Sequence, residues 1–571
     1  MASSDDEDLR LAMAMSLQQS PTGVAGDSTI IDLTSDTYEE EEEELRRAIA
    51  LSIQDTEIKG VLHANTTTTT TTETPATTNE TSTTTTGPAT GFMGIDRKAM
   101  EQERLARLGK RKREPSPGRP SKQVARSPAV TEPPHHPTLQ YPKGVIKRTF
   151  ATKYPRTNDI TLDELLEASK VHTAVISSFM FESDWLYVKL DPRTTKQIWL
   201  MNAPGEDVQQ KRMKELEETG VPNLKLHFPP MNGIRSMHSK FMLLWGKEKL
   251  RVVVPTANMM RLEWGEVANT WQPGCMENSV FLIDLPRRGD DTLGQKGDLT
   301  PFGRELLHFL EKQNVGQKVT DGVLKFDFAQ TSHLAFVHSI GGSHKTEPAH
   351  ATGLAGLAQA VRDVQCDEVE HIELEYASAS VGAINDTFLS RIYLAARGEA
   401  FTTTSSVSNP RDHIRIYFPT NETVEKTTGG PDCGGIISLS RQYYSAATFP
   451  KECLRDYDST RRGMLSHNKL LFARGRKTNG EPFAWVYVGS ANMSESAWGG
   501  QRVLKSGKVG SLNIRNWECG VVVPVPDDNF QQLKLEQDEV PPMSVFEGII
   551  EVPFHFPGAE YEGRQPWFRL G

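Results

Sequence analysis

The chain has 571 residues, of which 37% are hydrophobic and 24% charged, and its formal net charge is -10 at pH 7. This length is too great for one ordinary domain, and the modest hydrophobic fraction indicates that part of the chain forms no core. No apolar run reaches the roughly 18 residues of a membrane-spanning helix, and the acidic start does not fit a signal peptide, so we expect no membrane association. The five cysteines are sparse and lack C-x-x-C spacing, which favours a reducing, intracellular compartment over a disulfide framework.

The acidity is concentrated in residues 1–60, which hold 15 Asp and Glu against 4 Lys and Arg. Two segments of this tail, DEDLRLAMAMSLQQ and EEEELRRAIALSIQD, share a Leu, an Ala three positions later and a Ser four after that. These offsets place the shared residues on one stripe of a short helix, and the leading carboxylates favour the positive end of that helix. The pattern resembles the ubiquitin-interacting motif, which implies ubiquitin contacts by two sets of residues: Leu9, Ala12, Ser16, Leu45, Ala48 and Ser52.

Between these segments, STIIDLTSD contains a short strand-forming run, Ile30, Ile31 and Leu33, with an acidic flank. It resembles a SUMO-interacting motif, which docks by adding a strand to a sheet edge. Residues 61–139 are expected to be a disordered linker, because a threonine-rich tract is followed by a basic, proline-broken stretch. Residues 97–126 carry 11 Lys and Arg against 3 acidic residues, which favours a nuclear localisation signal or a nucleic-acid-binding arm. We therefore expect a nuclear protein.

Globular character begins near residue 140, and the remaining length suits two domains of common size. In chain order, TLDELLEAS from Thr161 predicts a helix with a T-x-x-E capping box. LKFDFAQ (324–330) predicts an alternating strand, and HSIGGSHK (338–345) predicts a glycine-rich turn rather than a phosphate cradle. Residues 127–571 have a net charge of about -4. Any DNA would therefore have to be bound in a local groove, with help from the basic stretch.

The globular region contains an internal repeat. The first copy runs MHSKFMLLWGKEKLRVVVPTANMMRLEWG and the second runs SHNKLLFARGRKTNGEPFAWVYVGSANMSESAWG. Each has H-x-K, an apolar run, a turn, a β-rich stretch and S/T-A-N-M. If each H-x-K lies in a strand, His238 and Lys240 share one face, as do His467 and Lys469.

A neutral imidazole beside a lysine and an amide suits a phosphoryl group, because one nitrogen can attack or protonate while the cations and amides bind the oxygens. Two copies facing each other supply a nucleophile on one side of phosphorus and a proton donor on the other.

The duplicated H-x-K...N resembles the phospholipase D superfamily, and its details are similar to tyrosyl-DNA phosphodiesterases. The superfamily's usual aspartate, five positions after the lysine, is replaced by Trp245 and Arg474, which is typical of this family. The resemblance spans roughly residues 140–571 and includes SSFMFESDWL, ASASVGAI (377–384) and GRQPWFRL. It implies an α/β fold of two similar halves, 140–345 and 346–571. Each half would be a mixed sheet flanked by helices, and a pseudo-two-fold axis would relate the two halves. A disordered tail would precede them in the sequence.

The resemblance also implies roles for individual residues. His238 would attack the 3'-phosphodiester to form a covalent phosphohistidine, and His467 would protonate the leaving tyrosine oxygen and then activate water. Four residues would bind the phosphate oxygens: Lys240, Lys469, Asn258 and Asn492. Glu518 and Asn269 would orient the two histidines from the opposite halves, although the family has glutamine where this chain has Asn269. Ser380 and Ser494 match positions that contact the DNA backbone.

The resemblance therefore implies that the protein hydrolyses 3'-phosphotyrosyl and related 3'-end adducts, such as stalled topoisomerase I remnants, on single-stranded or double-stranded DNA. No metal or other cofactor is expected in the reaction, because lysine cations supply the charge, and we expect a monomer. Two alternatives remain open. One is another nuclease or phosphodiesterase of the same superfamily, and the other is a non-catalytic ubiquitin-binding adaptor that has kept the fold.

Overall fold

The structure is a computed structural model that describes residues 139–568 except 232–233, 235, 267–275, 290–291, 346–349, 400–408, 504–508, 532 and 537–538. Several residues singled out in the sequence lie outside the described ones: the two tail motifs, the run Ile30, Ile31 and Leu33, the linker, and Asn269. Among the described helices, none is long and apolar enough to cross a bilayer.

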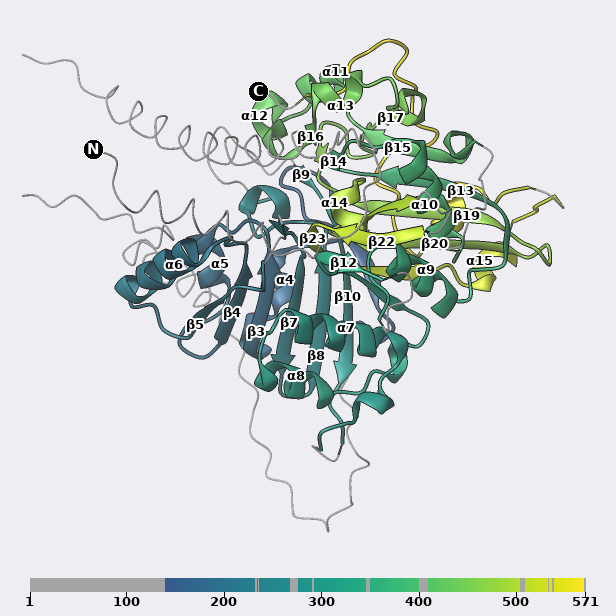
Figure 1. Cartoon of the computed structure of the whole chain (residues 1–571). Coiled ribbons are helices and arrows are strands. Elements are labelled where there is room, and N and C mark those ends of the chain that lie inside the picture. Colours follow the sequence, from purple (N-terminus) through teal and green to yellow (C-terminus); the bar gives the residue numbers. More distant parts are fainter. Residues whose placement is uncertain are drawn as a thin grey trace, which may run out of the picture. The chain divides into compact units, whose positions relative to one another are not determined.

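The first half is built on a mixed sheet in the order β2-β1-β10-β8-β7-β3-β4-β5 (Figure 1). Valine, isoleucine and leucine dominate its central strands, as expected of strands buried on both faces. The strands are β1 (Val145–Thr149), β2 (Asp159–Ile160), β3 (Val171–Ser178), β4 (Lys196–Met201), β5 (Leu224–His227), β7 (Phe241–Gly246), β8 (Lys249–Pro255) and β10 (Ser279–Pro286).

The second half has a sheet in the order β11-β23-β20-β19-β13-β15-β17, and the short β6 pairs with β23 off this path. The strands are β6 (Ser236–Met237), β11 (Ala335–Ser339), β13 (Val369–Ala377), β15 (Ile414–Phe418), β17 (Leu454–Asp456), β19 (Leu470–Lys477), β20 (Pro482–Gly489) and β23 (Asn516–Pro524). Because β11 belongs to this sheet, the change from first to second sheet comes before residue 345, where the sequence placed the boundary.

The two sheets repeat one pairing pattern. In the first, β10-β8-β7-β3 are antiparallel neighbours, and β3-β4-β5 are parallel. In the second, β23-β20-β19-β13 are antiparallel and β13-β15-β17 are parallel, in the same order. The prediction of two similar α/β halves is confirmed by this duplication.

Side chains of both sheets meet in one core cluster, and further helices cover the opposite face of each sheet. Leu243 on β7 and Phe472 on β19 belong to one core cluster between the sheets, which also takes in α7 (Pro301–Lys312). Leu244, one residue later, points the other way and joins the cluster under α4 (Leu162–Leu166), α5 (Ser183–Lys189) and α6 (Glu206–Thr219). Trp485 on β20 lies in the third cluster, under α9 (Leu354–Asp363) and α10 (Asp386–Ala396). Alternation along each strand therefore serves two cores at once.

Two local predictions have opposite outcomes. The capping box of α4 is confirmed: Thr161 Oγ1 accepts from the Glu164 amide at 3.1 Å, and the Glu164 carboxylate accepts from the Thr161 amide at 3.0 Å. The strand predicted over 324–330 is wrong. Leu324 ends helix α8 (Gln317–Leu324), Phe326 forms only an isolated bridge, and Ala329–Thr331 is a 3-10 turn. The alternating apolar residues of this segment, Phe326 and Phe328, are both buried. They pack two short turns against the core.

Candidate active site

The two H-x-K segments lie where the chain passes from one half into the other. Residues 238–240 connect β6, which pairs with β23 of the second half, to β7 in the first sheet. Residues 467–469 connect β18 (Leu465–Ser466), which pairs with β9 (Met276–Glu277) of the first half, to β19. The sequence analysis placed each H-x-K within a strand. In the structure, the histidines instead precede the sheet strands β7 and β19. This crossing brings each histidine against the opposite half.

His238 is held by a carboxylate from the second half. Its Nδ1 lies 2.8 Å from Oε2 of Glu518 on β23, and its amide donates to the Trp517 carbonyl at 3.0 Å. Glu518 is fully buried, yet its pKa is lowered by the neighbouring His238 and Lys240 against the effect of burial. An ionised carboxylate can only accept, so Nδ1 of His238 carries the proton and Nε2 keeps its lone pair. Burial lowers the pKa of His238, which favours this neutral form.

His467 is held in the same way, but by a residue that sequence reasoning missed. Its Nδ1 lies 2.7 Å from Oε2 of Glu263, in the 3-10 turn Arg261–Trp264, and this bond takes the place that the resemblance assigned to Asn269. Asn269 itself lies outside the described residues. Burial lowers the pKa of His467 to about 4, while His467 and Lys469 lower that of Glu263 to about 2 despite its burial. Both pairs thus present an oriented, neutral imidazole.

Two buried lysines accompany the histidines. Lys240 Nζ donates to the His238 carbonyl at 2.9 Å, and Lys469 Nζ donates to the carbonyls of His467 at 2.6 Å and Thr256 at 3.3 Å. Among the described residues, neither ammonium has a carboxylate oxygen within 4.0 Å. Burial lowers the pKa of Lys240 to about 8, and burial with the charge of Lys240 lowers that of Lys469. Buried cations without ion-pair partners are costly unless an anion binds there.

The two asparagines of the repeat have matching surroundings. Asn258 donates from Nδ2 to Glu263 at 2.7 Å, and its Oδ1 lies 3.5 Å from Ser178 Oγ. Asn492 uses Oδ1 to accept from Ser378 Oγ at 3.3 Å, so equivalent serines at the ends of β3 and β13 contact equivalent asparagines. Glu263 therefore links the amide of one repeat to the histidine of the other.

The serines taken from the resemblance lie beside Asn492. The Ser380 amide donates to Asn492 Oδ1 at 3.1 Å, and Ser380 begins the short β14 (Ser380–Val381). Ser494 is the N-cap of α14 (Glu495–Trp498), where its Oγ accepts from the Ala497 amide at 3.2 Å. Both therefore lie on the second-half side of the site, next to the phosphate-binding asparagine predicted from the repeat.

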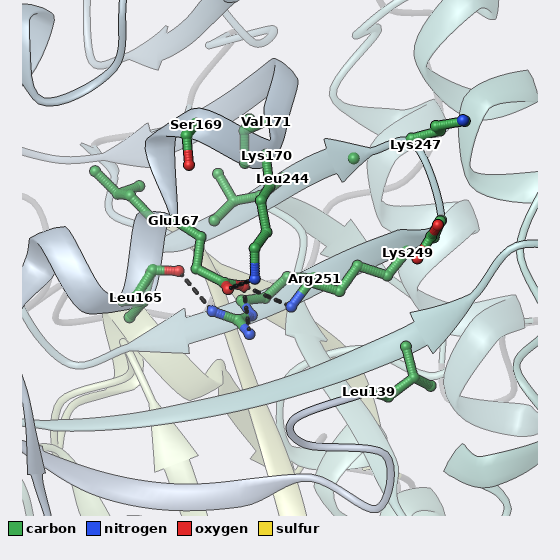
Figure 2. A pocket seen from close by; sticks show the side chains of 13 residues that line it. Leu139, Leu165, Glu167, Ser169, Lys170, Val171, Leu244, Lys247, Lys249 and Arg251 are labelled. Atoms are coloured by element: carbon green, nitrogen blue, oxygen red, sulfur yellow. Dashed lines mark hydrogen bonds and ion pairs between the residues drawn. The ribbon is translucent and has the colours of Figure 1, made fainter. Parts of the chain in front are cut away.

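A separate cavity of about 390 Å³ lies at the far end of the first sheet (Figure 2). Lys170, Lys249 and Arg251 converge there on the Glu167 carboxylate, at 2.5, 2.6 and 3.0 Å. Asp284 also binds Lys249 and Arg251, so each of the three cations has a carboxylate partner, and two of them have both. Strand β7 separates this cavity from Lys240 by six residues, about 20 Å. The cluster stabilises the fold at a distance from the histidines.

Comparison with known proteins agrees with this geometry. The family model described as tyrosyl-DNA phosphodiesterase matches residues 145–562, and the model of the ubiquitin interaction motif matches residues 4–20 and 40–56. The latter ranges contain the two repeats predicted in the tail.

Individual relatives are distant. Tyrosyl-DNA phosphodiesterase 1 of Arabidopsis thaliana is 23% identical over 393 residues, which is 65% of this chain and 60% of that protein, so the match spans less than two thirds of the relative. A probable tyrosyl-DNA phosphodiesterase of Caenorhabditis elegans is 22% identical over 64% of this chain and 79% of its own. The crystal structure of yeast tyrosyl-DNA phosphodiesterase shares the fold, with a TM-score of 0.53 and 17% identity over 74% of this chain and 99% of that one. Since the family model covers well over half of the sequence, the chain belongs to the tyrosyl-DNA phosphodiesterase family.

Proposed function

We propose that the protein hydrolyses 3'-phosphotyrosyl and related 3'-end adducts on DNA, such as topoisomerase I remnants, through a covalent phosphohistidine. The observation that carries the proposal is the pair of carboxylate-oriented histidines flanked by two buried lysines without carboxylate partners. Two buried ammonium groups beside two imidazoles suit an anion with oxygens on several sides, and a phosphodiester is such an anion. Family membership supports the choice of DNA with a tyrosyl leaving group.

In the first step Nε2 of His238 attacks phosphorus, and the bond from phosphorus to the tyrosyl oxygen breaks. Lys240 and Lys469 offset the charge that gathers on the phosphoryl oxygens, and Asn258 and Asn492 contribute amide groups. His467 gives its proton to the leaving oxygen. Burial lowers the pKa of His467 in the free site, and the charges of Lys469 and Lys240 lower it further. A bound phosphate cancels their field, so substrate binding itself favours the protonated acid.

In the second step His467, now neutral, takes a proton from water, and the resulting hydroxide displaces His238 from phosphorus. The bond between phosphorus and nitrogen breaks, and the product is a 3'-phosphate. Glu263 stabilises the imidazolium that forms at His467, and Glu518 stabilises positive charge on His238 during the covalent stage. Each carboxylate therefore acts on the histidine of the opposite half.

The test is cleavage of a single-stranded oligonucleotide with a 3'-phosphotyrosine in excess EDTA, followed by gel electrophoresis and by denaturing gels for protein-bound DNA. We expect the wild type to release a 3'-phosphate, His238→Ala to release none, and His467→Ala to accumulate whatever covalent adduct it forms. His172→Ala is the matched control, because His172 is an exposed histidine of the first sheet remote from the site.

Three results would contradict the proposal. Unchanged cleavage by folded His238→Ala would remove the assigned nucleophile. No cleavage by the folded wild type would favour the adaptor alternative. Cleavage of an unmodified internal phosphodiester in preference to the 3'-adduct would favour a nuclease of the same superfamily.

We also propose that the tail recruits the enzyme to ubiquitin-modified adducts, supported by the two motif matches. Substituting Ala12→Gln with Ala48→Gln places a larger side chain where a close approach is expected, and it should abolish retention on immobilised ubiquitin chains. Ala76→Gln with Ala89→Gln, in the threonine-rich tract, is the matched control. Equal retention of both double variants would contradict recruitment by these motifs.

We propose nuclear localisation on the basis of the basic stretch at residues 97–126. Replacing the four basic residues at 110–113 by alanine should shift a fluorescent fusion of the full chain from nucleus to cytoplasm. Replacing Arg104, Arg107, Arg119 and Lys122 removes the same charge and is the control. An unchanged distribution in the 110–113 variant would contradict a signal centred there.

A further inference from the structure

Two histidines and a glutamate converge on the second sheet, away from the active site. His371 and Glu373 lie two positions apart on β13 and share a face, and His413 immediately precedes β15, the parallel neighbour. His371 Nε2 lies 3.0 Å and His413 Nδ1 lies 2.8 Å from the same carboxylate oxygen, Oε1 of Glu373. One ligand atom from each residue lies within 4.8 Å of the other two.

Two sides of this triangle are close to the spacing of neighbouring ligand atoms around a tetrahedral metal. Zinc binds imidazole nitrogen and carboxylate oxygen at about 2.0–2.2 Å, which sets neighbouring ligand atoms about 3.3 Å apart. The two measured separations are a few tenths of an ångström shorter, so a cation could enter by a small outward shift of side chains. All three residues are partly exposed, which leaves a route from solvent.

The charges around the cluster also favour a cation. The Glu373 carboxylate forms ion pairs only with the two histidines among the described residues. Arg474 and Arg476 lie opposite β13 on β19, but Arg474 binds Glu375 and the Pro541 carbonyl. Arg476 binds backbone carbonyls, including those of Glu539 and Gly480. Neither guanidinium neutralises Glu373.

We propose that His371, Glu373 and His413 form a zinc site with water at the remaining position. Two imidazoles and one carboxylate are borderline ligands that suit zinc better than calcium or magnesium. The site lies at the amino end of β13, six residues or about 20 Å before Ala377, where the strand reaches the active site. Zinc there would join β13 to the start of β15 and act on stability, outside the hydrolytic reaction.

The experiment is calorimetric titration of the metal-free, full-length protein with zinc chloride. We expect His371→Gln, Glu373→Gln and His413→Gln each to weaken one binding event by at least the 10–100-fold that loss of an outer-shell group costs a metal site. His555→Gln is the matched control. His555 is an exposed histidine that lies 4.0 Å from a carboxylate oxygen of Asp458, but it belongs to no group of three candidate metal ligands among the described residues. It should titrate like the wild type.

Two further measurements separate this site from zinc binding elsewhere, including at the catalytic histidines. Zinc should raise the melting temperature of the wild type and His555→Gln but not of the three ligand variants. Crystals soaked in zinc chloride should give an anomalous peak at the zinc edge between the three side chains. Identical titrations for all variants, or a peak only at other positions, would overturn the proposal, and circular dichroism would confirm that the variants are folded.

Discussion

At the scale of residues, the carboxylates that orient the two histidines come from positions that are not equivalent in the two halves. Ser490 Oγ donates to Glu518 at 2.6 Å, and at the matching place in the first half Thr256 Oγ1 donates to Asn278 at 2.8 Å. Asn278 thus occupies the position equivalent to Glu518, and the carboxylate for His467 comes instead from Glu263. The pseudo-symmetry is broken at the residues that orient His238, the proposed nucleophile, and His467, the proposed proton donor.

This asymmetry explains which site residues could be predicted from the sequence. The histidines, lysines and asparagines repeat in both copies, so spacing alone singles them out. Glu263 aligns with Ala497, just before a tryptophan that both copies share. The glutamate is absent from the second copy, so this difference between the copies is its only sequence signal. Its contact with His467 spans 204 positions and depends on the crossing of the chain, which no local pattern encodes.

The first prediction concerns Glu263. Glu263→Gln keeps the shape but removes the negative charge that stabilises the imidazolium of His467, so we expect the single-turnover rate to fall about 10²-fold, within the range for general acid-base catalysis. The covalent adduct should persist longer than in the wild type. The same assay on Asn269→Ala tests the alternative assignment, in which the resemblance gives the orienting role to Asn269. A greater loss in Asn269→Ala than in Glu263→Gln would contradict the role of Glu263.

The second prediction concerns the alkaline limb of the pH profile. With its pKa at about 8, Lys240 is an ammonium below that pH and loses its charge above it, and Lys469 is shifted in the same direction. Phosphate binding should weaken with the loss of charge, so kcat/KM should decline with an apparent pKa at or below about 8. The limb for kcat should lie higher, because bound phosphate stabilises both ammonium groups.

Lys240→Arg supplies the control for this profile, since arginine stays protonated throughout the range. Its activity should be lower, because the planar guanidinium replaces a compact ammonium, but the share of the alkaline limb due to residue 240 should disappear. A wild-type kcat/KM that stays level up to pH 10 would contradict the assignment.

At the scale of elements, the crossing segments build the shared site. The short strands β6 and β18 each pair with the opposite half immediately before H-x-K, and the next strand returns to its own sheet. A two-residue strand carries almost no sequence signal, which is why the sequence placed these histidines inside longer strands. The long strands β7, β8, β19 and β20 were within reach of prediction because their apolar runs are continuous.

The third prediction tests the support beneath Glu518. Gly520 pairs with Gly489 between β23 and β20, and an added Cβ at Gly520 would lie 2.1 Å from the buried Tyr487 ring. Gly520→Ala should therefore lower the unfolding free energy by about 1–3 kcal/mol and slow cleavage, because Glu518 is two residues away. Gly435→Ala, where a Cβ meets nothing within 4 Å, is the control in the same urea titration and cleavage assay. Equal stability of both variants would contradict this packing.

At the scale of the whole molecule, duplication explains the architecture. Two copies of one motif predict two similar halves, and the matching sheet orders confirm this. The additions to each copy escaped prediction, since β1 and β11 extend the sheets through pairings 131 or more positions apart. Extensive packing between the sheets joins both halves into one core. Neither half carries a complete set of reactive groups, so function belongs to the assembled pair.

The last prediction follows from this dependence. Within one chain, His238 contacts Glu518 and His467 contacts Glu263, so each active site needs both halves. If both halves come from the same chain, mixing His238→Ala with His467→Ala should give only the sum of their residual activities on the 3'-phosphotyrosyl oligonucleotide, even after joint unfolding and refolding. If two chains exchanged halves, each mixed dimer would contain one intact site, and activity would rise well above that sum. Refolded wild type is the control for recovery, and size-exclusion chromatography of the mixture would identify the exchanged dimer.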